Sequence, residues 1–97
     1  MQVRLYEFYA DWCGPCDRQE EILEELEENN EELAVTRVDV DEEPDVASSH
    51  NVRSLPTLLV AEEDEDGEVT EVHDRFVGVT QEEDLAEALE TARMSSE

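Results

Sequence analysis

The stretch YEFYADWCGPCD, residues 6–17, joins a predicted strand to a predicted helix. Residues 3–9 are largely apolar, as expected of a central strand in a sheet that is covered on both faces. Residues 15–29 have apolar side chains at helical spacing, namely Ile22, Leu23 and Leu26. Cys13 and Cys16 lie at the junction. A Cys-x-x-Cys pair in this position predicts a dithiol suited to redox chemistry.

The start of the predicted helix gives the two cysteines different environments. Pro15 suits the first helical turn, where its missing N–H costs nothing and its fixed φ is already helical. Cys13 then faces unpaired backbone N–H groups and the positive end of the helix dipole, both of which favour the thiolate. We therefore expect Cys13, exposed and outermost, to be the nucleophile. Cys16, one turn further in, is expected to be the resolving thiol.

The rest of the sequence predicts a strand at 33–40, a short helix at 43–50, strands at 57–61 and 68–76, and a helix whose apolar positions run from 85 to 92. The acidic run 62–68 predicts a hairpin turn. Thr80 and Glu83 have the spacing of a capping box, and residues 93–97 are expected to fray. The fold class is therefore α/β. We expect one domain over residues 1–97, with a four-stranded mixed sheet and three helices.

The charge balance of the chain is its second strong feature. Thirty acidic residues against six basic ones give a net charge of −24, and all six basic residues are arginine. Self-repulsion of this kind destabilises a compact state at ordinary ionic strength, but at about 1 M salt the Debye length is only about 3 Å. The composition indicates a protein of a salt-accumulating cytoplasm, an extreme halophile. An acidic protein of an ordinary cell is the alternative.

The same composition limits the cellular location and the binding partners that the protein can have. Nucleic acid and anionic membranes are poor partners because both would be repelled. No stretch resembles a signal peptide, and the longest apolar run, 55–61, is too short to cross a bilayer. We expect a soluble, cytoplasmic monomer. Two cysteines so close together do not make a secreted disulfide scaffold, so they are expected to be redox-active or metal-binding.

Four motifs together resemble the thioredoxin family. Residues 8–16 resemble its active-site signature, and residues 38–44 resemble the end of a strand in that family. Residues 51–59 resemble its segment around a cis-proline, and residues 76–79 resemble the loop before its last helix. The motifs occur in family order and with family spacing, over about residues 3–92. The resemblance implies a minimal thioredoxin fold that starts directly at the active-site strand, as in glutaredoxins and short archaeal-type thioredoxins.

The resemblance also implies an activity, a protein disulfide reductase and electron carrier that works by thiol–disulfide exchange. Its partners would be protein disulfides and an upstream disulfide reductase, and it would need no cofactor beyond the Cys13–Cys16 disulfide itself. Pro56 would follow a cis peptide bond, and the Leu55 backbone would pair with an extended substrate segment. The expected docking surface is small and apolar, and consists of Trp12, Gly14, Pro15, Leu55, Pro56, Val77, Gly78 and Val79.

Glu7 interrupts the first strand and has two interpretations. By resemblance it replaces a buried acid beneath the second cysteine, where it would help to move the proton of Cys16. Alternatively, it is a carboxylate that reaches water at a strand end. Arg37 lies where the family often has a lysine near that acid, so it either pairs with Glu7 or projects into water.

Other functions compete with this one. A glutathione-dependent, glutaredoxin-like oxidoreductase is disfavoured by Gly14-Pro15, where that class usually has Pro-Tyr. A disulfide isomerase or oxidant often has histidine at position 15. A metal-binding module would combine the two cysteines with His50 and His73, but their spacing does not match finger-type sites, and we expect no metal site. A non-catalytic adaptor is the last alternative.

Overall fold

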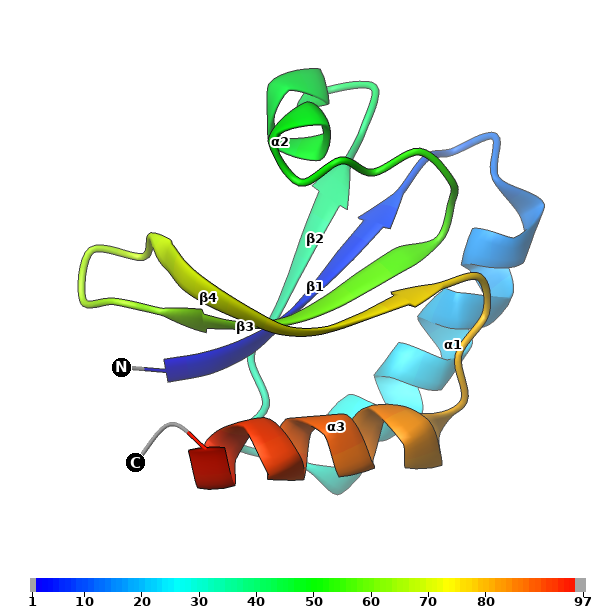
Figure 1. The fold of residues 1–97 in the computed structure, drawn as a ribbon. Helices are drawn as coiled ribbons and strands as arrows, with labels where there is room; N and C mark the ends of the chain where they lie inside the picture. Colours follow the sequence, from blue (N-terminus) through cyan, green and yellow to red (C-terminus); the bar gives the residue numbers. More distant parts are fainter. Residues whose placement is uncertain (1, 96–97) are drawn as a thin grey trace.

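The structure, a computed structural model, describes residues 2–95 (Figure 1). Within these residues it contains seven elements: β1 (Gln2–Tyr9), α1 (Gly14–Asn29), β2 (Val35–Asp39), α2 (Pro44–Ser49), β3 (Thr57–Glu63), β4 (Val69–Val77) and α3 (Glu82–Ser95). Their order is the one that the sequence predicts. No helix in the described part of the chain is long and apolar enough to cross a membrane.

The strands form one mixed sheet in the order β2-β1-β3-β4. β1 pairs in parallel with β2 and antiparallel with β3, and β3 pairs antiparallel with β4. β1 and β3 are therefore the central strands, which explains why both have apolar side chains on both faces. The predicted four-stranded mixed sheet is confirmed.

Helices cover both faces of the sheet. α1 and α3 lie on one face and α2 on the other (Figure 1). The larger core lies under α1 and α3 and includes Leu5, Ile22, Leu23, Leu26, Leu58, Val60, Leu85 and Leu89. The smaller core lies under α2 and includes Tyr6, Phe8, Val38, Ala47 and Leu59. Each fully buried large apolar side chain stabilises the fold by about 1.5–3 kcal/mol.

β3 is longer than the sequence predicts. It continues past Ala61 to Glu63, so Glu62 and Glu63 belong to a buried strand and not to the acidic turn. Both carboxylates have partners, which makes their burial possible. Glu63 accepts hydrogen bonds from Arg4 Nε, at 2.9 Å, and from the Tyr6 hydroxyl, and Glu62 is hydrogen-bonded to His73.

The hairpin turn itself is shorter than predicted. It is held by Asp64, whose Oδ1 accepts hydrogen bonds from the backbone N–H groups of Asp66 and Glu68. Gly67 completes the turn with a φ of 84°, a conformation that glycine adopts without strain. The turn therefore lies within the acidic run 62–68 that the sequence predicts, between Glu63 and Val69.

α3 differs from its prediction at both ends. The Thr80 hydroxyl donates to the Gly78 carbonyl and does not cap the helix, so the prediction of a capping box is wrong. The first helical hydrogen bonds go to the Gln81 carbonyl, from Asp84 and Leu85. The helix continues to Ser95, so residues 93–95 are helical and not frayed. Residues 96 and 97 of the predicted tail lie outside the described residues.

Candidate active site

Cys13 and Cys16 form a disulfide at the N-terminus of α1, with their Cα atoms 5.4 Å apart. Cys13 is the N-cap residue, and its Sγ accepts a hydrogen bond from the backbone N–H of Cys16 at 3.3 Å. Pro15 lies in the first turn. The sulfur of Cys13 therefore faces the helix N–H groups, as the sequence predicts, in a position that favours negative charge.

The exposure of the two sulfurs differs from the prediction. Cys13 is 6% exposed and Cys16 is 5% exposed, so Cys13 is not the exposed, outermost residue that we expected. Both cysteines pack with Ala10, and the half-buried side chains of Tyr9 and Leu55 lie against them. Leu55 comes from the loop before β3, the segment that the resemblance places at the docking surface.

Glu7 lies on the central strand β1, two residues before its end, and its carboxylate does not reach water as one interpretation expected. It is 2% exposed and, together with Cys16, lines a cavity of about 230 Å³. Its Oε2 atom makes no hydrogen bond within residues 2–95. Burial raises the pKa of Glu7 to about 7, and the neighbouring Glu20 carboxylate adds to the effect. An acid that changes protonation near neutral pH thus shares a cavity with one of the two cysteines.

Arg37 on β2 lies between Glu7 and two glutamates of α1. Its Nε is 2.6 Å from Glu20, its Nη2 is 2.8 Å from Glu27, and its closest approach to Glu7 is 3.8 Å. Hydrogen bonds from Arg37 to these two glutamates hold the pKa of Arg37 above its usual range. Arg37 lowers the pKa of Glu7 but does not overcome the effect of burial.

The loop before β3 brings a second segment to the cysteines. The Leu55–Pro56 peptide bond is cis, as the resemblance implies. The Pro56 carbonyl accepts a hydrogen bond from the Gly78 N–H at 2.8 Å, which joins this loop to the end of β4. Gly78 has a φ of 91°, and a Cβ at this position would meet nothing within 4 Å. The backbone conformation, and not crowding within the chain, therefore requires this glycine.

Comparison with known proteins agrees with this geometry. The family model that describes thioredoxin matches residues 1–91. The chain belongs to the thioredoxin family. It is 42% identical to a thioredoxin of Listeria monocytogenes over 88% of this chain and 78% of that one, and 42% identical to a thioredoxin of Staphylococcus aureus over 91% and 80%. The structure of a mutant thioredoxin from Halobacterium salinarum is 42% identical, with a TM-score of 0.73 over 92% of this chain and 73% of that chain.

Membership of the thioredoxin family, with two cysteines at disulfide distance, makes the chain an enzyme, a dithiol–disulfide oxidoreductase. Electrons pass through the Cys13–Cys16 pair, and the family acts on protein disulfides. The glutaredoxin, metal-binding and adaptor alternatives are not favoured by these relatives.

The residues expected to form the thioredoxin docking surface differ in exposure. Trp12 is 71% exposed, Val77 62% and Val79 39%, and Gly14 and Pro15 are also exposed. Leu55 is half-buried against the cysteines, whereas Pro56 is buried. The Trp12 indole N–H donates to Asp41 at 2.8 Å, which holds this exposed ring by its polar edge. Large apolar side chains thus remain in contact with solvent on a strongly acidic protein.

Sequence reasoning missed Gln19. This side chain of α1 is fully buried. Its Nε2 donates to the Thr80 carbonyl at 3.0 Å, and its Oε1 accepts from the Thr80 N–H at 2.7 Å. The pair of bonds fixes the loop after Gly78 to the active-site helix. A signal was present, because Gln19 occupies the same helical face as Ile22 and Leu26, where a polar residue needs a partner.

The structure does not assemble the proposed cysteine–histidine metal site. The two cysteines are bonded to each other. His50 packs near the rings of Tyr6 and Phe8, at centroid distances of 6.3 and 5.8 Å. His73 instead lies beside Glu62 and Glu71 on the sheet.

Proposed function

We propose that this thioredoxin is a protein disulfide reductase in which Cys13 is the nucleophile and Cys16 the resolving thiol. The observation that carries the assignment is the position of Cys13 Sγ at the N-cap of α1, where it accepts a helix N–H. The Cys13 thiolate attacks one sulfur of a substrate disulfide and releases the other as a thiolate. Cys16 then attacks Cys13 Sγ and releases the second substrate sulfur. Two electrons pass to the substrate, and the Cys13–Cys16 disulfide forms.

Glu7 is proposed to accept the proton of Cys16 during the second step. Cys16 reacts only as a thiolate, and it is buried, which disfavours that charge. Glu7 lines the same cavity and has a pKa of about 7. A base that titrates near the working pH is the most efficient proton acceptor. When the disulfide is reduced again, the carboxyl group can return the proton.

The substrate is proposed to bind as an extended segment beside the disulfide. The Leu55 backbone would pair with it in the manner of an added strand. Apolar contacts would come from Trp12, Gly14, Pro15, Pro56, Val77, Gly78 and Val79. Support comes from the exposure of Trp12 and Val77 and from the packing of Leu55 on the cysteines.

The electron donor, the oligomeric state and the cellular environment are also proposals. An upstream disulfide reductase would supply the electrons, and no cofactor would be needed besides the cysteine pair. The protein would work as a monomer in a salt-accumulating cytoplasm. The net charge of −24 and the similarity to a thioredoxin of Halobacterium salinarum support the high-salt setting.

A redox titration of the Cys13–Cys16 couple in multimolar salt tests the function. The couple is titrated separately against a dithiol buffer and against glutathione. We expect a strongly reducing two-electron couple that equilibrates with the dithiol and not with glutathione. Ready equilibration with glutathione at a more oxidising potential would instead place the protein among glutaredoxins or isomerases. A Cys16→Ser variant, which should accumulate the mixed disulfide on Cys13, tests the order of the two cysteines.

A further inference from the structure

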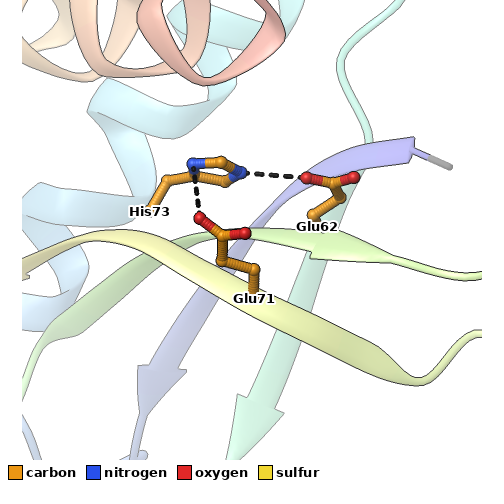
Figure 2. Close-up of side chains that lie close together, drawn as sticks. All are labelled: Glu62, Glu71 and His73. Atoms are coloured by element: carbon orange, nitrogen blue, oxygen red, sulfur yellow. Dashed lines mark hydrogen bonds and ion pairs between the residues drawn. The ribbon is translucent and has the colours of Figure 1, made fainter. Parts of the chain in front are cut away.

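Three side chains that could bind a metal ion meet near the end of the β3–β4 hairpin. Figure 2 shows Glu62 of β3 and Glu71 and His73 of β4 pointing toward one another. His73 Nε2 is 3.1 Å from Glu62 Oε1, and His73 Nδ1 is 3.6 Å from Glu71 Oε2. The side chain of Glu62 is 6% exposed and that of His73 is 12% exposed, whereas Glu71 is 65% exposed. Two nearly buried groups and one exposed carboxylate therefore share this site.

The strand register makes the cluster unfavourable without a cation. Glu62 lies directly opposite Glu71 across the ladder. Like charges in directly opposite positions destabilise a sheet, and burial of Glu62 strengthens their repulsion because less water screens it.

The backbone places His73 next to this pair of carboxylates. Val60 lies opposite Asp74 and the next residue, Ala61, lies opposite Val72, so His73 is the extra residue of a β-bulge. A bulge changes the direction in which a side chain points. His73 thus lies beside Glu62, on the side where a groove of about 370 Å³ separates β4 from α3.

The chemistry of the three groups matches a divalent transition-metal ion. One ligand atom from each residue lies within 4.8 Å of the others. Imidazole nitrogen and carboxylate oxygen bind Zn²⁺ at about 2.0–2.2 Å, so rotation of the exposed Glu71 side chain would close the set around one ion. We propose that Glu62, Glu71 and His73 form a binding site for one divalent ion of the zinc type. Its positive charge would offset the two opposed carboxylates.

This site is separate from the redox centre. Glu62 lies near one end of β3, whereas Thr57, the residue after Pro56, lies at the other. The bound ion would join the two strands of the hairpin and stabilise the folded state by mass action. The competing explanation is that the contacts of His73 with both glutamates hold this cluster together without a metal ion.

Zn²⁺ titration of the oxidised protein tests the proposal, because the disulfide prevents the cysteines from binding the metal. About 1 M sodium salt suppresses diffuse binding to the other carboxylates. Isothermal titration calorimetry should show one saturable site, and NMR should show a shift of the His73 ring and none of the His50 ring. Zn²⁺ should also raise the melting temperature.

Matched variants decide between the explanations. His73→Gln and Glu71→Gln should each weaken Zn²⁺ binding by at least about tenfold, since even loss of a supporting group around a metal ligand costs about 10- to 100-fold. Glu65→Gln, a change in the nearby turn, should leave binding unchanged. Both variants in the cluster are checked for folding by circular dichroism. Binding that all three variants retain equally, or absence of a saturable site in the original protein, would overturn the proposal.

Discussion

Two regions of the same sheet each bury a glutamate of a central strand, but only one of these glutamates has its hydrogen-bond partners. Glu63, at the end of β3, accepts hydrogen bonds from Arg4 and Tyr6. Glu7, in the middle part of β1 toward the cysteines, leaves Oε2 without a hydrogen bond within residues 2–95, and its nearest arginine nitrogen is 3.8 Å away. Both residues are less than a tenth exposed.

The two glutamates differ because the arginine beside Glu7 is bound by other carboxylates, whereas the arginine beside Glu63 binds Glu63 itself. Arg4 donates to the Glu63 carboxylate and to the Thr36 hydroxyl. Arg37 is bound by Glu20 and Glu27 of α1 and cannot satisfy Glu7 as well. A buried polar group without a partner costs about 1–3 kcal/mol. The chain therefore keeps a destabilising carboxyl group at the redox end of the sheet and a stabilising one at the other end, a pattern expected of a functional site.

The largest expected effect comes from removing the acid at the redox end. Glu7→Gln should slow the resolving step by about 10²- to 10⁴-fold, the usual contribution of a general base. The measurement is the rate at which the mixed disulfide on Cys13 decays, by stopped flow or quenched sampling. Glu63→Gln is the matched control and should keep the original rate. An equal loss of rate in both variants would show that Glu7 acts only through the fold.

The pH dependence of stability gives the next test. The pKa of Glu7 rises from its ordinary value of 4.5 to about 7 on folding, so the folded state holds this proton more tightly than the unfolded state. The protein is therefore most stable with respect to this group below pH 4.5, where Glu7 is protonated in both states, and it loses stability as the pH rises through 7 and the buried carboxyl ionises. The size of that loss is on the order of 3 kcal/mol.

The Glu7→Gln variant has no titratable group at this position and should not show that loss of stability. Chemical denaturation of both proteins at pH 4 and pH 8, in the same salt, gives the comparison. The variant should gain stability relative to the original protein between the two pH values. A difference between the proteins that stays constant with pH would contradict the raised pKa of Glu7.

At the other end of the sheet, the corresponding substitution of glutamate by glutamine should change the stability of the protein and not the rate of the resolving step. Glu63→Gln removes the charge that pairs with Arg4 and weakens the bond to Tyr6. We expect a loss of about 1.5–3 kcal/mol, the usual range for hydrogen bonds to a charged group. Denaturant unfolding measures it. A variant as stable as the original protein would remove the basis for calling Glu63 structural.

The sequence predicts the elements and the cysteine geometry because these depend on local patterns. Strands and helices follow from apolar spacing, and Pro15 and the cysteines follow from the rules for a helix start. The resemblance supplied the cis bond before Pro56. The prediction that failed concerns the burial of charged side chains. Glu62 and Glu63 look like turn residues until Arg4, Tyr6 and His73 are known to meet them in space.

The same limit applies to the active site. The exposure of Cys13 depends on Leu55, which comes from a distant segment of the chain. The contact of Arg37 with Glu20 and Glu27 depends on how α1 crosses the sheet. Contacts between distant segments are set by tertiary packing, which a pattern of single residues does not encode.

The smallest expected effect comes from Arg37, because it touches Glu7 only at 3.8 Å and is shared with two other carboxylates. It is nevertheless the charge that lowers the pKa of Glu7, whereas Glu20 and Glu27 raise it. Arg37→Gln should therefore move the inflection in the pH profile of the resolving step to higher pH. Arg4→Gln, at the far end of the sheet, should leave that inflection in place. A shift to lower pH would mean that Arg37 mainly screens Glu7 from water, and an unchanged profile in both variants would mean that Glu7 does not set the inflection.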